Sequence, residues 1–229
     1  MIGPMESAAL ILSLKVAGAA TLVSLPLAVL LAYGMARRDF RGKTIADILL
    51  HVPLVVPPVV VGYLLLIAFA PNAPVGHWLE EAGLGVAFRW QGAALASGIM
   101  ALPLMVRSIR QAFEAEPPIY REVAATLGAG AFARFWRVSL PLAAPAIATG
   151  TLLGFARAIG EFGATITFAA NIPGLTQTLP LALYSAAQIP GGEAEAARLA
   201  LLCLLPAVLA LVASEMLSRR ARRRTGLTS

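Results

Sequence analysis

Charge is the scarcest ingredient of this sequence. Only 13% of its 229 residues are charged, against about 25% in an average soluble domain, whereas 59% are hydrophobic. So little charge predicts a membrane protein. The net charge of +6 does not indicate nucleic-acid binding, because the basic residues gather at the ends of apolar runs, where they set membrane orientation.

Groups that carry out chemistry are scarce too. The sequence has one cysteine, Cys203, and two histidines, His51 and His77, so it offers no intrachain disulfide and no cluster with metal-ligand spacing. It lacks the Gly-x-x-x-x-Gly-Lys-Ser/Thr pattern of a nucleotide-binding loop, and the Ser/His, paired-Asp or His-Glu-x-x-His patterns of an intramembrane enzyme. We therefore expect no catalytic residue, no metal and no cofactor on this chain, which is not predicted to be an enzyme.

Long apolar runs are abundant. A membrane-crossing helix needs roughly 20 mostly apolar residues. Four runs qualify, and a fifth is expected to begin at Pro141, because proline is tolerated at a helix start. The five runs cover residues 9–35, 47–70, 91–112, 141–159 and 197–217.

Arginine separates the connections into two kinds. Segments 37–43 and 107–137 and the C-terminal tail are basic, whereas 71–90 has a single arginine and 159–196 has no lysine or arginine. Since basic loops stay in the cytoplasm, this predicts an all-α polytopic protein with about five spans, N-terminus outside and C-terminus inside.

The apolar but interrupted stretch 162–189 needs a separate interpretation. A sixth span through it would place the arginine tail outside. Irregular backbone at membrane depth is tolerated where protein or water satisfies it. We therefore interpret 160–195 as an external or re-entrant segment within a single transmembrane domain, 1–229.

The basic connection between the third and fourth runs has a pattern of its own. A Pro-Pro pair at 117–118 ends the preceding helix, and residues 119–127 have helical composition. Gly128 and Gly130 then break the chain before a second short helix over 131–138.

Aromatic and basic side chains alternate along that second helix. Phe132, Phe135 and Trp136 are spaced to share one face, with Arg134 and Arg137 on another. The residues alone fit a loop lying on lipid headgroups. They fit equally a docking surface for a cytoplasmic partner, since aromatics and arginine are common interface anchors.

The fixed spacings in this segment resemble the EAA signature of bacterial ABC importer permeases. That signature is Glu-Ala-Ala, three residues, Gly, nine residues, Ile, any residue and Leu-Pro. The matching residues are Glu122-Val123-Ala124, Gly128, Val138 and Leu140-Pro141, with valine in two places. The resemblance implies that 113–140 is a cytoplasmic coupling loop that docks into a groove of a separate ATP-hydrolysing subunit. It assigns ATPase coupling to Glu122, Ala124, Gly128, Phe132, Arg134, Phe135, Trp136, Arg137 and Pro141.

Two further stretches narrow the resemblance. HVPLVVPPVVVGY at 51–63 and GEFGATITF at 160–168, continued by NIPG and TLP up to residue 180, are similar to molybdate importer permeases, and the likeness extends over 10–217. The sulfate/thiosulfate permeases share much of the GEFGA and LPL pattern and are the alternative. A channel or carrier that works without ATP is the alternative of another class.

This family resemblance implies a type I ABC importer permease fold and inward movement of molybdate, or of tungstate. It implies a homodimer of two permease copies, two cytoplasmic ABC ATPase subunits that bind the ATP and Mg, and an external molybdate-binding protein. The expected location is the plasma (inner) membrane of a bacterium or archaeon, in contact with lipid and not with nucleic acid.

Candidate residues for the substrate path come from physical requirements. Passage of a dianion needs donors that release it easily, such as backbone N–H groups and hydroxyls, and the stretch 160–167 offers both; close helix packing through small residues is the other interpretation. Prolines at 53, 57 and 58 must bend the second run, either as a gate or as a static kink. Arg157 and Glu161 are expected to pair along one helix. The candidate path residues are Pro57, Pro58, Gly160, Glu161, Gly163, Thr165 and Thr167.

Overall fold

The computed structural model of the chain describes residues 3–224, and the side chains of residues 3–220. The side chains of the last three arginines of the basic tail therefore lie outside the described part. Every regular element within the described residues is helical.

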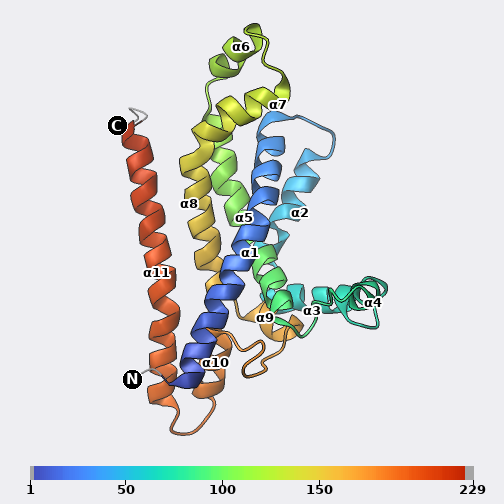
Figure 1. Cartoon of the computed structure of the whole chain (residues 1–229), viewed down its shortest axis with the longest axis vertical. Coiled ribbons are helices and arrows are strands. Elements are labelled where there is room, and N and C mark those ends of the chain that lie inside the picture. Colours follow the sequence, from blue (N-terminus) through green and yellow to red (C-terminus); the bar gives the residue numbers. More distant parts are fainter. Residues whose placement is uncertain (1–2, 225–229) are drawn as a thin grey trace.

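Four long helices run along the longest axis of the molecule (Figure 1). Each carries a proline in its interior, at positions 26, 103, 145 and 206. The long helices are α1 (Pro4–Arg37), α5 (Trp90–Ala115), α8 (Leu140–Ile159) and α11 (Glu193–Arg224).

The second predicted span is broken. It consists of α2 (Lys43–Val55) and α3 (Pro58–Phe69), whose axes differ in direction by 112°. The break falls at Pro57, whose backbone is extended (φ −53°, ψ 132°), and α3 starts at Pro58. The expected bend is therefore confirmed at this pair, whereas Pro53 lies inside α2 without interrupting it. A short helix, α4 (Pro74–Glu81), follows α3 at the side of the bundle (Figure 1).

The described helices that are long and apolar enough to cross a membrane number four, or five if the bent α2–α3 pair counts as one span. The expectation that a span begins at Pro141 is wrong. Helix α7 (Ala131–Arg134), the π-helical turn η1 (Phe135–Ser139) and α8 form one continuous helix from Ala131 to Ile159. Proline at the second position of α8 is accommodated because the adjoining π-helical turn already departs from the regular hydrogen-bond pattern.

The interrupted segment 160–195 forms two short helices, α9 (Gly163–Phe168) and α10 (Leu179–Ala187), joined by a loop. Helix α9 packs against α3 and α5, and α10 against α11 and α1. In Figure 1 the segment leaves α8 and joins α11 at the same end of the bundle, near the N-terminus. Its assignment to the external side stays a prediction.

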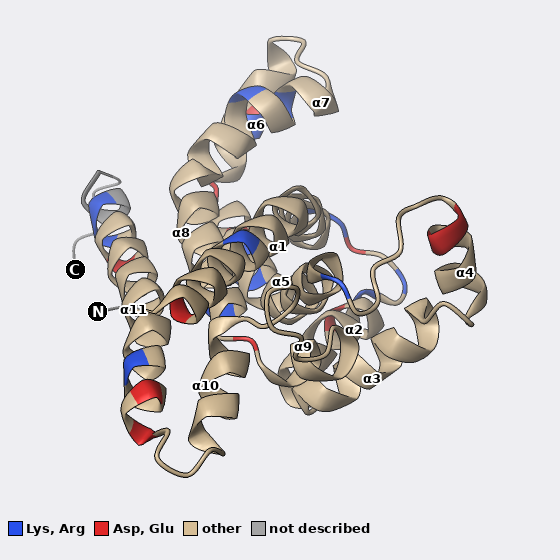
Figure 2. Ribbon diagram, turned by 60° about the horizontal axis from the view of Figure 1, so that its bottom comes forward, with Lys and Arg blue, Asp and Glu red and all other residues tan. Residues whose placement is uncertain are grey.

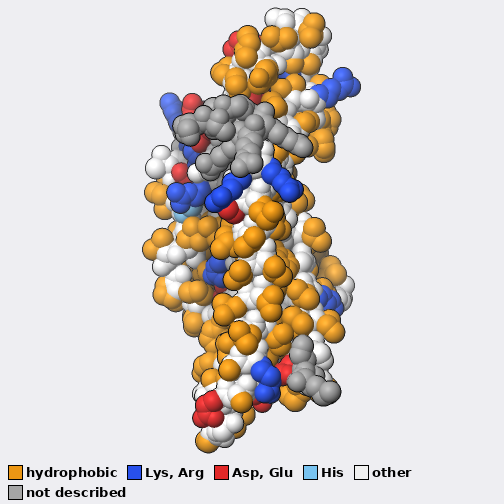
Figure 3. Space-filling model, turned by 90° about the vertical axis from the view of Figure 1, so that its left-hand side faces the viewer, with side chains coloured by type: hydrophobic (Ala, Val, Ile, Leu, Met, Phe, Trp, Pro, Cys, Tyr) orange, Lys and Arg blue, Asp and Glu red, His pale blue; other side chains and the backbone are white. Residues whose placement is uncertain are grey.

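Small side chains let the long helices approach each other. Ala17 and Ala20 of α1, Ala101 of α5 and Ala158 of α8 form one buried cluster with Ile159, as expected where helices approach closely through small residues. Elsewhere the same helices enclose the larger side chains of Met105, Ile109 and Phe113. The outer surface of α11 is apolar along its middle (Figure 3), as expected of a helix surrounded by lipid tails.

The two ends of the bundle differ in the charged residues that they carry. Figure 2 shows basic residues on α6 (Pro118–Thr126) and at the C-terminal end of α11, and acidic residues on α4 and at the start of α11. The C-terminus of α1, α6 and the C-terminus of α11 lie toward the same end in Figure 1. We call this end the basic end.

Candidate functional site

The EAA segment, residues 113–140, projects from the basic end (Figure 1). Helix α6 has no buried residue. It ends at a turn in which Gly128 has φ +81°, a left-handed conformation that favours glycine. The chain then enters α7 and continues as one helix into α8. The predicted pair of short helices separated by glycine is therefore present, with the second fused to a long helix.

A buried carboxylate, Glu116, holds this segment to the bundle. Its side chain is 2% exposed and accepts hydrogen bonds from Arg37 Nη2 at the end of α1 and from Ser139 Oγ, the latter at 3.1 Å. Arg121 Nε of α6 lies 3.6 Å from Glu116 Oε1. Burying a carboxylate is costly unless charges and donors surround it, and here they come from three different elements.

Glu116 was not among the residues expected from the sequence. The available signal was an acid directly before a Pro-Pro pair, between arginine-rich stretches. Its main partner, Arg37, is 79 positions away in the chain, so no local pattern could pair them.

The three aromatic rings form one connected group, as expected, but they differ in exposure. Phe132 and Trp136 are exposed (76% and 53%) and contact each other, with ring centroids 6.0 Å apart. Phe135 contacts the Trp136 ring at 5.6 Å, but it is half-buried and also packs edge-on against Tyr33 of α1 at 4.7 Å. Phe135 therefore lies between the exposed aromatic pair and α1.

An uncovered apolar surface results on the EAA segment. Glu122, Gly128 and Arg137 are exposed beside it, while Ala124 and Arg134 are half-buried. Pro141, also exposed, is the second residue of α8. A contiguous apolar patch rimmed by polar residues marks an interaction site. The large apolar side chains exposed on the segment are Ile119, Tyr120, Val123, Leu127, Phe132 and Trp136.

The short connection between α1 and α2 also belongs to the basic end. Lys43 Nζ donates a 2.9 Å hydrogen bond to Asp39 Oδ1, which lowers the pKa of Asp39 below its usual value. A lowered carboxyl pKa contributes stability above the ordinary pKa and loses it as the pH falls. Because this pair is exposed, solvent screens it and the contribution is small.

The candidate path residues gather at the other end of α8, where α3 crosses α9. A Cβ added at Gly62 would lie 2.5 Å from the backbone oxygen of Ala164, and one at Gly163 would lie 2.8 Å from Pro58 Cβ. We call this crossing the elbow contact. The two glycines are needed for close helix packing, so Gly163 has no room to expose its backbone to a ligand.

Glu161 and the threonines nearby have different surroundings. Glu161 is 2% exposed, pairs with Arg157 Nη1 at 2.5 Å as expected, and accepts the N–H of Ala164 at 2.9 Å. Thr167 donates to the carbonyl of Gly163 at 2.9 Å. The Thr165 hydroxyl is buried and has no hydrogen-bond partner among the described residues. Gly160 is exposed, with no atom of another element within 4 Å of a Cβ placed there.

Glu161 thus ties the end of α8 to the start of α9. Both of its oxygens are occupied, which leaves it little capacity to bind a further group. The elbow contact and the EAA segment lie at opposite ends of one helix, Ala131–Ile159. Among the described residues, no group of three or more His, Cys, Asp and Glu side chains is placed to hold a metal ion.

A bundle of membrane-length helices with a projecting EAA segment defines a membrane permease of a transport system. The chain belongs to the family of binding-protein-dependent transport system inner membrane components, which matches residues 24–223.

The relatives are more specific. The chain is 48% identical over 222 residues to the "Molybdenum transport system permease protein ModB" of Escherichia coli (strain K12), covering 96% of this chain and 97% of that protein. It is 47% identical to the ModB protein of Haemophilus influenzae, with 97% of each covered. The "Sulfate transport system permease protein CysT" of Escherichia coli (strain K12) is 36% identical over 155 residues, 68% of this chain and 56% of that protein.

Solved structures support the fold. A bacterial ABC transporter involved in the import of the acidic polysaccharide alginate superimposes with a TM-score of 0.70, at 18% identity, over 99% of this chain and 81% of that one. The same type of transporter has been solved in complex with an alginate pentasaccharide-bound periplasmic protein, with a TM-score of 0.65, the same 18% identity and the same coverage. The predicted fold class, an all-α polytopic importer permease, is therefore confirmed.

Proposed function

We propose that the chain is the permease subunit of an ATP-driven importer that moves molybdate, or the related tungstate, into a bacterial cell. Near-full-length identity of 48% to a molybdenum transport permease is the observation that carries the proposal. The sulfate permease is both less similar and matched over a shorter stretch, which favours molybdate over sulfate.

The proposal includes the partners of the chain. The uncovered apolar patch of the EAA segment docks into a cytoplasmic ATPase, which binds the ATP and Mg that this chain has no loop to hold. Two permease copies and two ATPases form the complex, and an external binding protein delivers the oxyanion. The solved complex of a structurally similar transporter with its periplasmic protein supports the last partner.

Movement passes along the helix Ala131–Ile159. Its first turns belong to the EAA segment, which includes Phe132 and is anchored by Glu116. Its last turn is tied by Glu161 to α9, which packs on α3 at the elbow contact. Closure of the ATPase pair displaces the EAA segment as a rigid body, and the continuous helix transmits this displacement to the elbow contact, where the path opens.

The test is the substrate dependence of the reconstituted complex. The chain, co-expressed with its ATPase, is placed in liposomes, and ATP hydrolysis is measured with the binding protein carrying molybdate, tungstate or sulfate. We expect stimulation by molybdate or tungstate and none by sulfate. Stimulation by sulfate alone would establish the alternative substrate class, and oxyanion flux through the isolated chain would establish a channel or carrier.

A further inference from the structure

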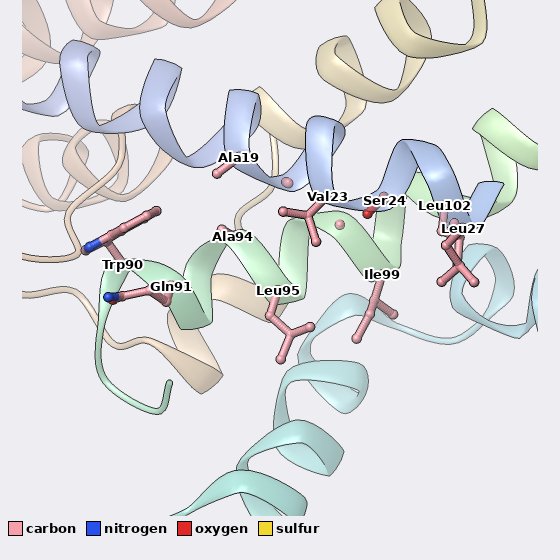
Figure 4. A pocket seen from close by; sticks show the side chains of 12 residues that line it. Ala19, Val23, Ser24, Leu27, Trp90, Gln91, Ala94, Leu95, Ile99 and Leu102 are labelled. Atoms are coloured by element: carbon pink, nitrogen blue, oxygen red, sulfur yellow. The ribbon is translucent and has the colours of Figure 1, made fainter. Parts of the chain in front are cut away.

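A groove of about 320 Å³ runs between α1 and α5. Figure 4 shows Ala19, Val23, Leu95 and Ile99 along it, with Trp90 and Gln91 at one end. Apart from that end, Ser24 is its one polar lining residue. The groove therefore fits a molecule that has an apolar chain and a polar group at one end of it.

An unneutralised cation stands at the polar end. Lys15 Nζ lies 3.8 Å from the centre of the Trp90 ring, and among the described residues no carboxylate lies within ion-pair distance of it. The ring attracts the ammonium group but carries no net charge. Lys15 is exposed, so its positive charge and its N–H donors are available to an anion.

The depth of Lys15 in the membrane indicates that the anion it meets belongs to a lipid headgroup. At about 1.5 Å per residue, the stretch of α1 from Lys15 to Met35, just before the arginines of the basic end, is about 30 Å long, which is the hydrocarbon thickness of a bilayer. Lys15 and Trp90 therefore lie at the headgroup level of the leaflet opposite the basic end, where tryptophan is enriched and a lysine side chain can extend to the headgroups.

The groove has the length of one leaflet. From Trp90 to Leu102 helix α5 rises about 18 Å, slightly more than the roughly 15 Å of half a hydrocarbon core. Small residues form its floor; a Cβ on Gly98 would lie 2.8 Å from Ser24 Oγ of α1. The two helices thus touch along the bottom of the groove, and the groove stays open at the surface of the molecule.

We propose that this groove binds an anionic phospholipid, with the phosphate at Lys15 and the side-chain amide of Gln91 and one acyl chain along α1 and α5. A free anion would not use the apolar groove. A second copy of the chain would have to bring a carboxylate to Lys15 at headgroup depth. The site does not depend on which oxyanion the transporter carries.

The experiment measures lipid binding to the delipidated complex by native mass spectrometry. Phosphatidylglycerol and phosphatidylcholine with the same acyl chains are titrated separately. We expect preferential retention of phosphatidylglycerol, reduced about fivefold in Lys15→Gln, as expected for one basic residue near an anionic headgroup. Ala19→Phe fills the groove and is expected to reduce binding of both lipids at this site.

The matched control is Lys43→Gln, which removes the other lysine of the sequence, in the exposed α1–α2 connection. Retained preference in Lys15→Gln, or an equal loss in Lys43→Gln, would overturn the proposal. A disulfide between two copies of Val23→Cys, in a Cys203→Ser background, would show that a second copy occupies the groove instead. Neither outcome bears on the substrate, which the liposome experiment tests separately.

Discussion

The EAA segment and the elbow contact are held by different forces. One buried carboxylate, Glu116, ties Arg121 and Ser139 within the EAA segment to Arg37 of α1, and the segment leaves a large apolar surface uncovered. The elbow contact is fastened by two glycines that bring backbones together, and it leaves little room for anything else. The buried charges keep the EAA segment in position while its apolar surface binds a partner. The backbones at the elbow contact leave no space for one helix to move without the other, so the contact transmits motion.

The largest effect is expected from removing the charge that fastens the EAA segment. Glu116→Gln leaves Arg37 and Arg121 without their counter-charge and should lower the free energy of unfolding by about 3 kcal/mol, the lower end of the range for a buried pair, since both arginines keep some contact with solvent. Thermal unfolding in detergent measures this.

Coupling provides a second measurement on the same variant. ATP hydrolysed per molybdate transported should rise in Glu116→Gln, because the segment no longer moves with the helix. Asp39→Asn, which loosens only an exposed pair, is the control and should change neither quantity. A Glu116→Gln variant with normal coupling would contradict the role of Glu116 as the fastening residue.

The next largest effect is expected from removing exposed aromatic side chains from the apolar surface of the EAA segment. The double variant Phe132→Ala with Trp136→Ala should weaken association with the ATPase by about 30-fold or more, the usual loss for an interface anchor, while thermal stability stays unchanged. Phe135→Ala, whose ring packs on Tyr33, should show the reverse pattern. Co-purification and unfolding measured on both variants would separate docking from packing, and equal results would remove the distinction.

The close packing at the elbow contact is tested by adding a single methyl group. Gly62→Ala would place a methyl group 2.5 Å from the backbone oxygen of Ala164, and such overpacking should cost about 1–3 kcal/mol, with reduced transport. Gly34→Ala in α1 meets no atom within 4 Å and should be neutral or slightly stabilising. Similar unfolding temperatures for the two variants would mean that the α3–α9 crossing has more freedom than the structure shows.

The smallest effect is expected at Thr165, and it decides whether the elbow contact also touches substrate. Its hydroxyl is buried without a partner among the described residues, so Thr165→Val should leave stability unchanged or raise it by up to about 1 kcal/mol. Transport assays with varied molybdate then decide its role: an unchanged KM assigns it to packing, and a raised KM assigns it to the path.

Some of these features were predictable from the sequence and others were not. Apolar runs and arginine clusters are local patterns, so the number of spans and the place of the EAA segment could be predicted. The bend at Pro57 followed from the missing N–H of proline. The packing of Phe135 on Tyr33 and the Glu116–Arg37 pair are contacts between distant parts of the chain, which is why neither was predicted. The start of the fourth span was predicted wrongly because the π-helical turn that joins α7 to α8 has no clear local pattern in the sequence.

The interior prolines of the four long helices have a mechanical consequence. Each removes the N–H that would bond the carbonyl four residues earlier, and Pro103 and Pro206 lie close to the midpoints of α5 and α11. Resistance to bending is therefore lowered at one point along each of the four helices. In the continuous helix Ala131–Ile159 that point is Pro145, midway between the end that carries the EAA segment and the end that lies at the elbow contact. Bending there would change the angle between these two ends.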